Sequence, residues 1–216
     1  MPIPRGLLLA AMLYAIAAFA AIVGLKPPIQ PTSSAYTPMV RSLLAAVAFG
    51  IVLLWPTARM AERGSPWPAR RVALDAVTLA IALQAIFWPL HLVTQWTLAR
   101  AAAIDLMLVG WIAATGAAIA CGMRPGGRPA AWSLAWIAVA AGGPLLDVLG
   151  VPAPWPGALG PFVALIELAP VPEQSSQPVE WARAAWPWTL AAAGWALALR
   201  GAARPAPGVA PAHPLG

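Results

Sequence analysis

The sequence predicts an all-α, polytopic integral membrane protein, and two observations carry that prediction. Of the 216 residues, 61% are hydrophobic and only 9% are charged, against roughly 25% charged residues in ordinary soluble domains. The charges also stand at the ends of long apolar stretches, as they do beside membrane spans. So few charges could not cover a soluble globule, which excludes soluble enzymes, nucleic-acid binders and disulfide-stapled secreted domains.

Six apolar stretches are predicted to cross the bilayer as helices, within a single transmembrane domain over residues 1–200. The expected spans are 7–25, 38–55, 72–96, 102–121, 131–149 and 184–199. The first stretch is longer than the apolar region of a secretory signal, which has about 7–15 residues, so we interpret it as an uncleaved helix. The low-complexity segment 201–216 is predicted to be a disordered cytoplasmic tail.

One further apolar segment, residues 157–168, lies between the fifth and sixth spans. It has about twelve residues, contains Pro161 and Glu167, and is too short to cross a hydrocarbon core of about 30 Å. We therefore predict a short re-entrant or interfacial segment, which is tolerated where protein covers its backbone. A seventh full span is the alternative interpretation.

The basic residues predict the orientation of the spans. With the N-terminus inside, nine of the thirteen lie on the inner side: Arg5, Arg59, Arg63, Arg70, Arg71, Arg124, Arg128, Arg200 and Arg204. The other four lie outside: Lys26, Arg41, Arg100 and Arg183. Cytoplasmic loops carry the excess of Lys and Arg, so both termini are predicted to be cytoplasmic. Heavy use of Ala, Gly, Pro, Arg and Trp with a single Lys favours a bacterial source, and hence the cytoplasmic (inner) membrane.

A polar face is predicted on the third span. Gln84, Trp88, His91 and Gln95 share one side of a helix because they are spaced by four, three and four residues. His91 has two interpretations, a structural histidine that is hydrogen-bonded in the bundle, or a haem ligand or proton relay. The other histidine, His213, lies in the predicted tail, so a haem held by two histidines of this chain is excluded. We predict no cofactor, with haem at His91 the one candidate.

Two acids near the span ends are interpreted as partner-pairing groups. Asp75 lies a turn from Arg70 and Arg71 and is expected to form an ion pair at the cytoplasmic boundary. Asp105 lies near the outer start of the fourth span, where a helix-end or pairing role is more typical than transport.

Small residues and tryptophans carry predictions about packing. Small residues along the fourth span predict close helix packing: Gly110, Ala114, Gly116, Ala118 and Ala120. Tryptophans near the predicted span ends are typical of an interfacial aromatic belt: Trp55, Trp67, Trp96, Trp132, Trp155, Trp181, Trp186 and Trp188. The single cysteine, Cys121, excludes an intramolecular disulfide and is expected to be a buried, small hydrophobic residue.

The layout resembles the permeases of type-2 ATP-binding-cassette exporters, a group that includes the haem-exporter B subunit of cytochrome c maturation. The segment AERGSPWPARRVAL (61–74) is similar to the region before helix three of such permeases, and ALGPFVALIEL (158–168) to their segment ahead of the last helix. The resemblance implies that residues 61–71 form a coupling loop that contacts an ATPase on another chain, since this sequence has no phosphate-binding loop.

From these observations we expect a permease-like transmembrane subunit of a multi-component complex. The expected partners are the lipid bilayer and other protein subunits, a cytoplasmic ATPase or a second copy of the chain among them, and no nucleic acid. The residues expected to dock a partner are Arg63, Trp67, Arg70 and Arg71. The competing interpretation is a non-catalytic structural subunit of a respiratory or photosynthetic complex. A membrane-embedded enzyme would have only His91, Gln84, Gln95 and Asp105 to use, and no recognisable catalytic motif joins them.

Overall fold

The computed structural model describes residues 5–24, 33–61, 68–94, 96–124, 127–150, 160–169 and 179–202. The elements are α1 (Arg5–Ile22), α2 (Ser33–Phe49), η1 (Gly50–Leu54), α3 (Trp55–Ala61), α4 (Pro68–Thr94), α5 (Leu98–Gly122), α6 (Pro129–Val148), α7 (Pro161–Leu168) and α8 (Trp181–Ala202). Within these ranges every regular element is helical and none is a strand. The prediction of an all-α chain is confirmed.

Four of the helices are long and apolar enough to cross a membrane. They are Tyr36–Met60, which joins α2, η1 and α3, Ala69–Leu90 in α4, Leu98–Gly122 (α5) and Pro129–Leu146 in α6. α1 adds a shorter apolar helix, Gly6–Ile22. The described helices are those of a helical membrane protein, as the composition indicated.

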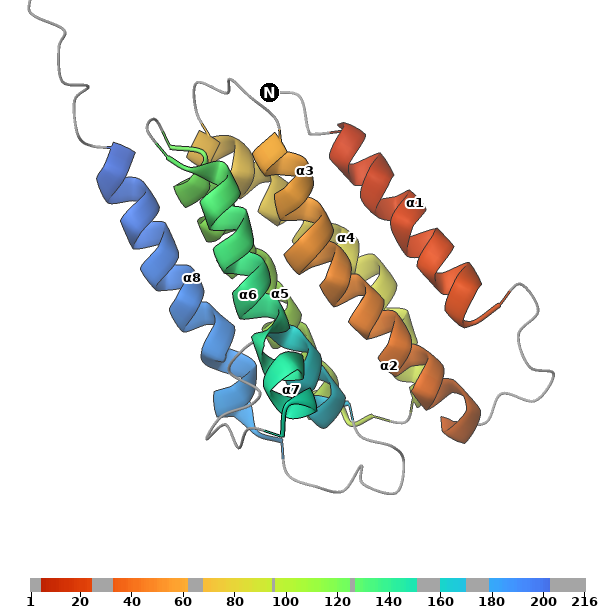
Figure 1. Ribbon diagram of the computed structural model, residues 1–216. Coiled ribbons are helices and arrows are strands. Elements are labelled where there is room, and N and C mark those ends of the chain that lie inside the picture. Colours follow the sequence, from red (N-terminus) through yellow and green to blue (C-terminus); the bar gives the residue numbers. More distant parts are fainter. Residues whose placement is uncertain are drawn as a thin grey trace, which may run out of the picture.

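α5 forms the centre of the bundle. Within its span 78% of the residues are buried, against 17% for α6 and 22% for α4. Its neighbours are α8 on one side and α4 on another, with α6 and α7 beside it (Figure 1). The small residues predicted to allow close packing are buried there: Gly110, Ala114, Gly116, Ala118 and Ala120. The remaining helices surround α5 and turn apolar side chains outward, as a bilayer requires.

Successive long helices alternate in direction, so α1 begins and α8 ends at the same end of the bundle (Figure 1). The short α7 lies at the opposite end, beside the first turns of α5 and α8 (Figure 1). We call these the α8-C-terminal end and the α7 end.

A π-helical turn, η1, interrupts the helix formed by α2 and α3. Its cause is in the sequence, because Pro56 has no N–H to donate to the carbonyl of Val52 four residues earlier. The helix widens by one residue per turn at this point, so that Trp55 N donates to the carbonyl of Gly50, five residues back. Gly50, the first residue of this turn, lies against the ring of Tyr14 in α1.

Candidate functional site

A polar cluster joins α4 and α5 inside the membrane-crossing part of the bundle. Gln84 Nε2 donates to Asp105 Oδ1 at 2.7 Å. The indole Nε1 of Trp88 donates to Gln84 Oε1 at 2.5 Å, so the amide uses both of its ends. Two residues of the predicted polar face, Gln84 and Trp88, are thus brought together, and Asp105 has the pairing role that was expected of it.

The depth of this cluster makes it a candidate site. Asp105 lies seven residues after the start of α5 at Leu98, which places it about 10 Å along the helix at 1.5 Å per residue. Polar groups at such depth are costly and mark functional positions by default. Asp105 and Gln84 are half-buried. A half-buried carboxyl that one amide orients can accept a hydrogen bond or a cation.

The other two residues of the predicted polar face are His91 and Gln95, and neither side chain lies in the described part of the structure. His91 belongs to α4, but its side chain is outside the described part of the structure, and Gln95 lies between the described ranges. Haem binding by His91 therefore stays a prediction. Within the described residues, no group of three or more His, Cys, Asp or Glu side chains is placed to hold a metal ion.

A buried ion pair closes the base of the loop between α3 and α4. Arg59 Nε lies 2.6 Å from Asp75 Oδ2, and Arg59 Nη2 donates to Asp75 Oδ1 at 2.9 Å. Asp75 is fully buried and Arg59 nearly so. The expected ion pair of Asp75 is confirmed, and Arg59, from the far side of the loop, forms it. Such a two-point guanidinium–carboxylate contact fixes direction as well as distance.

Of the four predicted docking residues, two can be placed. Arg70 and Arg71 lie in the first turn of α4 and are exposed at the α8-C-terminal end of the bundle. Arg63 and Trp67 lie in residues 62–67, outside the described ranges.

α7 is the described part of the segment predicted to be re-entrant or interfacial, whose residues 157–159 lie outside the described ranges. Its eight residues would extend about 12 Å, and one face, including Pro161, Ala164 and Leu165, is buried. Gly160 precedes it with φ +93°, and a Cβ there would lie 2.1 Å from the carbonyl oxygen of Ala140. Only glycine permits this turn, which tucks α7 against α6.

Three arginines at the α7 end hold α7 in place. Arg41 Nη2 donates to the carbonyl of Ile166 at 3.3 Å, and the buried Arg100 donates through Nη1 to the carbonyl of Leu168 at 3.3 Å. Arg183 forms ion pairs with Glu167 and with Glu180. The last carbonyls of a helix have no partner within it, and the guanidinium groups of Arg41 and Arg100 donate to such carbonyls of α7.

The seam between α5 and α8 was missed by sequence reasoning. Trp188 Nε1 donates to the carbonyl of Leu106 at 2.9 Å, and Trp195 Nε1 to that of Ala113 at 3.0 Å. Both donors and both acceptors are seven residues apart, so the two helices run parallel in a heptad register. That spacing was the available signal. The belt interpretation is also wrong for Trp55 and Trp96, which are buried, 4% and 5% exposed.

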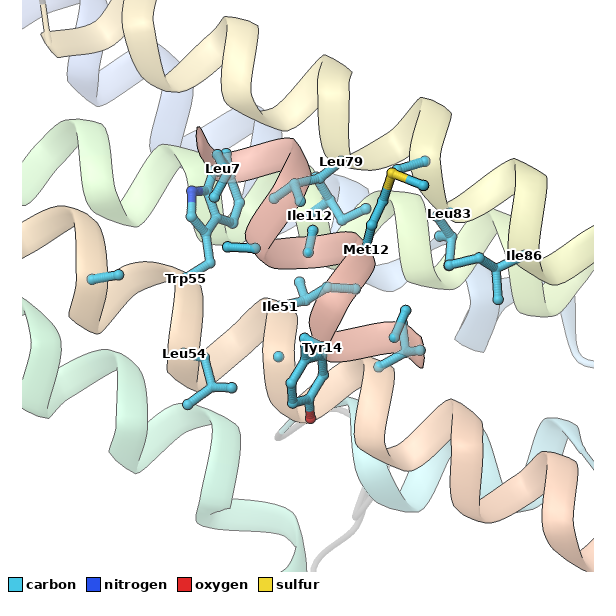
Figure 2. Close-up of a pocket in the computed structure, with 17 residues that line it drawn as sticks. Leu7, Met12, Tyr14, Ile51, Leu54, Trp55, Leu79, Leu83, Ile86 and Ile112 are labelled. Carbon is cyan, nitrogen blue, oxygen red and sulfur yellow. The ribbon is translucent and has the colours of Figure 1, made fainter. Parts of the chain in front are cut away.

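An apolar cavity, also unforeseen, lies between α1 and the bundle. It has a volume of about 230 Å³. Its walls come from α1, α2 with η1 and α3, and α4, and Ile112 of α5 contributes to it (Figure 2). No pattern in the sequence marks it, because its lining residues are the apolar ones that any membrane helix carries.

No protein-family model matches the chain, and neither the curated proteins nor the solved structures give a match. The function is therefore argued from the chain's own geometry.

Proposed function

We propose that the chain is a permease-like transmembrane subunit of a multi-component complex in a bacterial cytoplasmic membrane, with ATP hydrolysis carried out by a separate protein. The proposal includes six spans with both termini in the cytoplasm and a docking loop over residues 61–71. The observation that carries it is the buried Arg59–Asp75 ion pair, which ties the two sides of that loop together beneath it.

A loop that transmits the motion of a partner needs a rigid connection between the two helices that flank it. The guanidinium of Arg59 on α3 and the carboxylate of Asp75 on α4 join the helices at either side of residues 62–67. Two exposed guanidinium groups, those of Arg70 and Arg71, stand where the loop enters α4. This arrangement combines a fixed base with cationic groups that can pair with an acidic surface on a soluble partner.

Helix lengths support six spans. α8 has 22 residues and α1 has 18, which correspond to about 33 Å and 27 Å of helix, close to the thickness of the hydrocarbon core. The proposed orientation is supported by the use made of Arg41, Arg100 and Arg183. These arginines of the α7 end bond to α7, and each is buried or half-buried. The exposed arginines of the described residues lie at the α8-C-terminal end: Arg70, Arg71, Arg128 and Arg200.

The proposal is tested by recovery of partners in a mild detergent. The chain carries an affinity tag, and the proteins that accompany it are identified and quantified by mass spectrometry. We expect an ATPase in the wild-type preparation and at least tenfold less of it with Arg70→Ala/Arg71→Ala, since tenfold corresponds to about 1.4 kcal/mol. The matched control, Arg128→Ala/Arg200→Ala, removes the same charge from the same end of the bundle and should retain the ATPase.

Three results would overturn it. Equal loss in both double variants would show that net charge or orientation matters, and not the loop. Unchanged recovery in the loop variant would remove the docking role of Arg70 and Arg71. Recovery of cofactor-bearing respiratory or photosynthetic chains without an ATPase would assign the protein to the class of structural subunits instead.

A further inference from the structure

We propose that Asp105 receives a basic side chain, Lys or Arg, from a transmembrane helix of a partner chain, and that this helix lies along α5 between α4 and α8. The inference rests on one part of the proposed function, that the chain is a subunit of a multi-component complex, and not on the ATPase. It names a second partner, which meets the chain inside the membrane.

The hydrogen bonds of the polar cluster leave one carboxylate oxygen of Asp105 without a donor. The indole Nε1–H of Trp88 can only donate, so the Gln84 atom that it meets is the amide oxygen. The amide nitrogen of Gln84 therefore faces Asp105 and donates to Oδ1. The other oxygen, Oδ2, accepts no hydrogen bond from the described residues and is not enclosed by the bundle.

Asp105 lies on the one line of α5 that reaches the surface inside its membrane-crossing part. Between residues 101 and 122 the side chains of α5 are buried except for five on one side of the helix, which are half-buried: Ala102, Asp105, Leu106, Val109 and Ala113. We call these five residues the outward line of α5. α4 flanks the line where Gln84 meets Asp105, and α8 flanks it where Trp188 donates to the carbonyl of Leu106. Oδ2 of Asp105 therefore opens between α4 and α8.

The described part of the chain supplies no cation to this oxygen. The arginines near the same end of the bundle are bonded to α7: Arg41, Arg100 and Arg183. The other described arginines belong to the α8-C-terminal end. A second copy of the chain would bring the same arginines in the same places, so its described residues also offer no free cation at the depth of Asp105.

The depth of Asp105 identifies the class of its partner. Asp105 lies about 10 Å along α5 from the first residue of that helix, while lipid head groups lie outside the hydrocarbon core and acyl chains carry no charge. A transmembrane helix, in contrast, carries a basic side chain to this depth as part of its own chain. Acidic and basic residues inside membranes are costly alone and pair with one another, so complementary charge favours a basic helix.

The shape of the outward line also suits a helix. From Ala102 to Ala113 it extends about 16 Å, three turns of an α-helix. Its other members are apolar, and two of the five are alanines, which let a second backbone approach closely. Asp105 would then be the one charged contact within an otherwise apolar interface.

The first experiment identifies the neighbour of the outward line in the native membrane. The photo-reactive residue benzoylphenylalanine replaces Val109, about one turn from Asp105, and after irradiation the full chain is purified and the attached peptide is sequenced by mass spectrometry. We expect a transmembrane peptide of another protein that contains Lys or Arg. The matched control carries the same group at Ala141, which is exposed and lies seven residues before the end of α6 at Val148. It should not yield this peptide.

The requirement for charge is measured in the same photo-reactive chain. Asp105→Asn keeps the shape of the side chain and an acceptor for Gln84 but removes the charge, so it should lower the yield of the adduct at least tenfold, which corresponds to about 1.4 kcal/mol. Asp105→Glu should retain the adduct. Glu180→Gln removes the same charge from a residue that pairs with Arg183 at the start of α8, and it should leave the yield unchanged. Each variant must elute as the parent chain does.

The second experiment exchanges the two charges, and it keeps the test valid if Asp105→Asn fails to fold. Once the adduct locates the basic residue of the partner, Asp105→Arg is combined with the change of that residue to Asp. Each single change places like charges together and should lower the yield at least tenfold. The double change should restore most of it.

Four results would overturn the inference: an equal yield with Asp105→Asn, an adduct only with lipid or with a second copy of the chain, an attached peptide without Lys or Arg, and no recovery in the double change. The ATPase is quantified in the same preparations. Recovery of an ATPase without the adduct would refute this inference alone, and the adduct without an ATPase would refute the role of an ATPase in the proposed function alone.

Discussion

α8 and α1 lie at opposite edges of the same bundle, and they are held to it in different ways (Figure 1). α8 runs along α5, where two indole N–H groups donate to α5 carbonyls and Gly194 lets the backbones approach closely. Arg124 extends this seam, since its Nη1 donates to the carbonyl of Leu197 at 3.0 Å. α1 contacts α2 and α4, and Tyr14 Oη donates a hydrogen bond from α1 to the carbonyl of Ala46 in α2.

The difference shows what holds a helix in place in a membrane, where removal of apolar surface from water no longer drives helices together. Lipid tails are as apolar as Leu, so helices in a membrane associate through close contact of small residues and hydrogen bonds between helices. The α5–α8 seam has both. The α1 boundary has the apolar composition of a contact, yet a cavity of about 230 Å³ lies within it. A hydrophobic face alone therefore does not secure a helix here.

The largest expected loss of stability comes from adding a methyl group to the α5–α8 seam, and the same substitution at the α1 boundary is its comparison. Gly194→Ala would place a Cβ 2.7 Å from the Cβ of Ala117, which is fixed to the α5 backbone. Overpacking typically costs about 1–3 kcal/mol, and the gain in helix propensity recovers only about 0.5–1 kcal/mol, so we expect a net loss of about 1–2 kcal/mol. Gly50→Ala meets the Tyr14 ring at a similar 2.8 Å, but that ring ends a side chain that can swing into the cavity.

For Gly50→Ala we therefore expect a change within about 0.5 kcal/mol, an ordinary value for an adaptable site. Reversible unfolding by SDS in mixed micelles, followed by circular dichroism, measures both. Gly6→Ala is the control for helix propensity, because nothing lies within 4 Å of its Cβ position. If Gly50→Ala proves as costly as Gly194→Ala, the two boundaries are equally rigid and the comparison fails.

Removing the indole N–H groups of the seam should have the next largest effect. Trp188→Phe/Trp195→Phe deletes the donors to the carbonyls of Leu106 and Ala113 and part of the ring contact. Hydrogen bonds between membrane helices average about 0.6 kcal/mol, so the loss of both should cost about 1 kcal/mol in the same assay. Trp181→Phe makes the same substitution seven residues earlier on α8, where the side chain is 47% exposed, and should change stability little. A comparable loss in both would refute a specific role for the seam.

Much of the helical layout could be predicted from the sequence, because charge and apolar runs are properties of single segments. The all-α class followed from composition, and the pairing roles of Asp75 and Asp105 followed from the cost of burying an acid without a partner. The identities of their partners did not follow. Arg59 reaches Asp75 across the loop, and Gln84 reaches Asp105 from the neighbouring helix, so both depend on which helix faces lie together.

The partners of the tryptophans were also beyond prediction from the sequence. An indole at a span end suits a headgroup region, and that preference says nothing about a neighbouring carbonyl. Trp55 and Trp96 are buried, and Trp188 donates to α5. The cavity was beyond prediction for a further reason, since a space arises from the mismatch between packed surfaces and leaves no pattern in one chain.

The smallest expected effect is the most local one. Tyr14→Phe keeps the ring and removes the hydroxyl that donates to Ala46, so the global loss should be about 0.6 kcal/mol. Because this is the point at which α1 is tied to α2, the change should appear in α1 itself. Hydrogen exchange in nanodiscs, read by mass spectrometry, should show faster exchange of α1 amides with the protection of α8 unchanged. Faster exchange in both helices would mean that α1 is part of the central packing, and α1 would then differ from α8 only in composition.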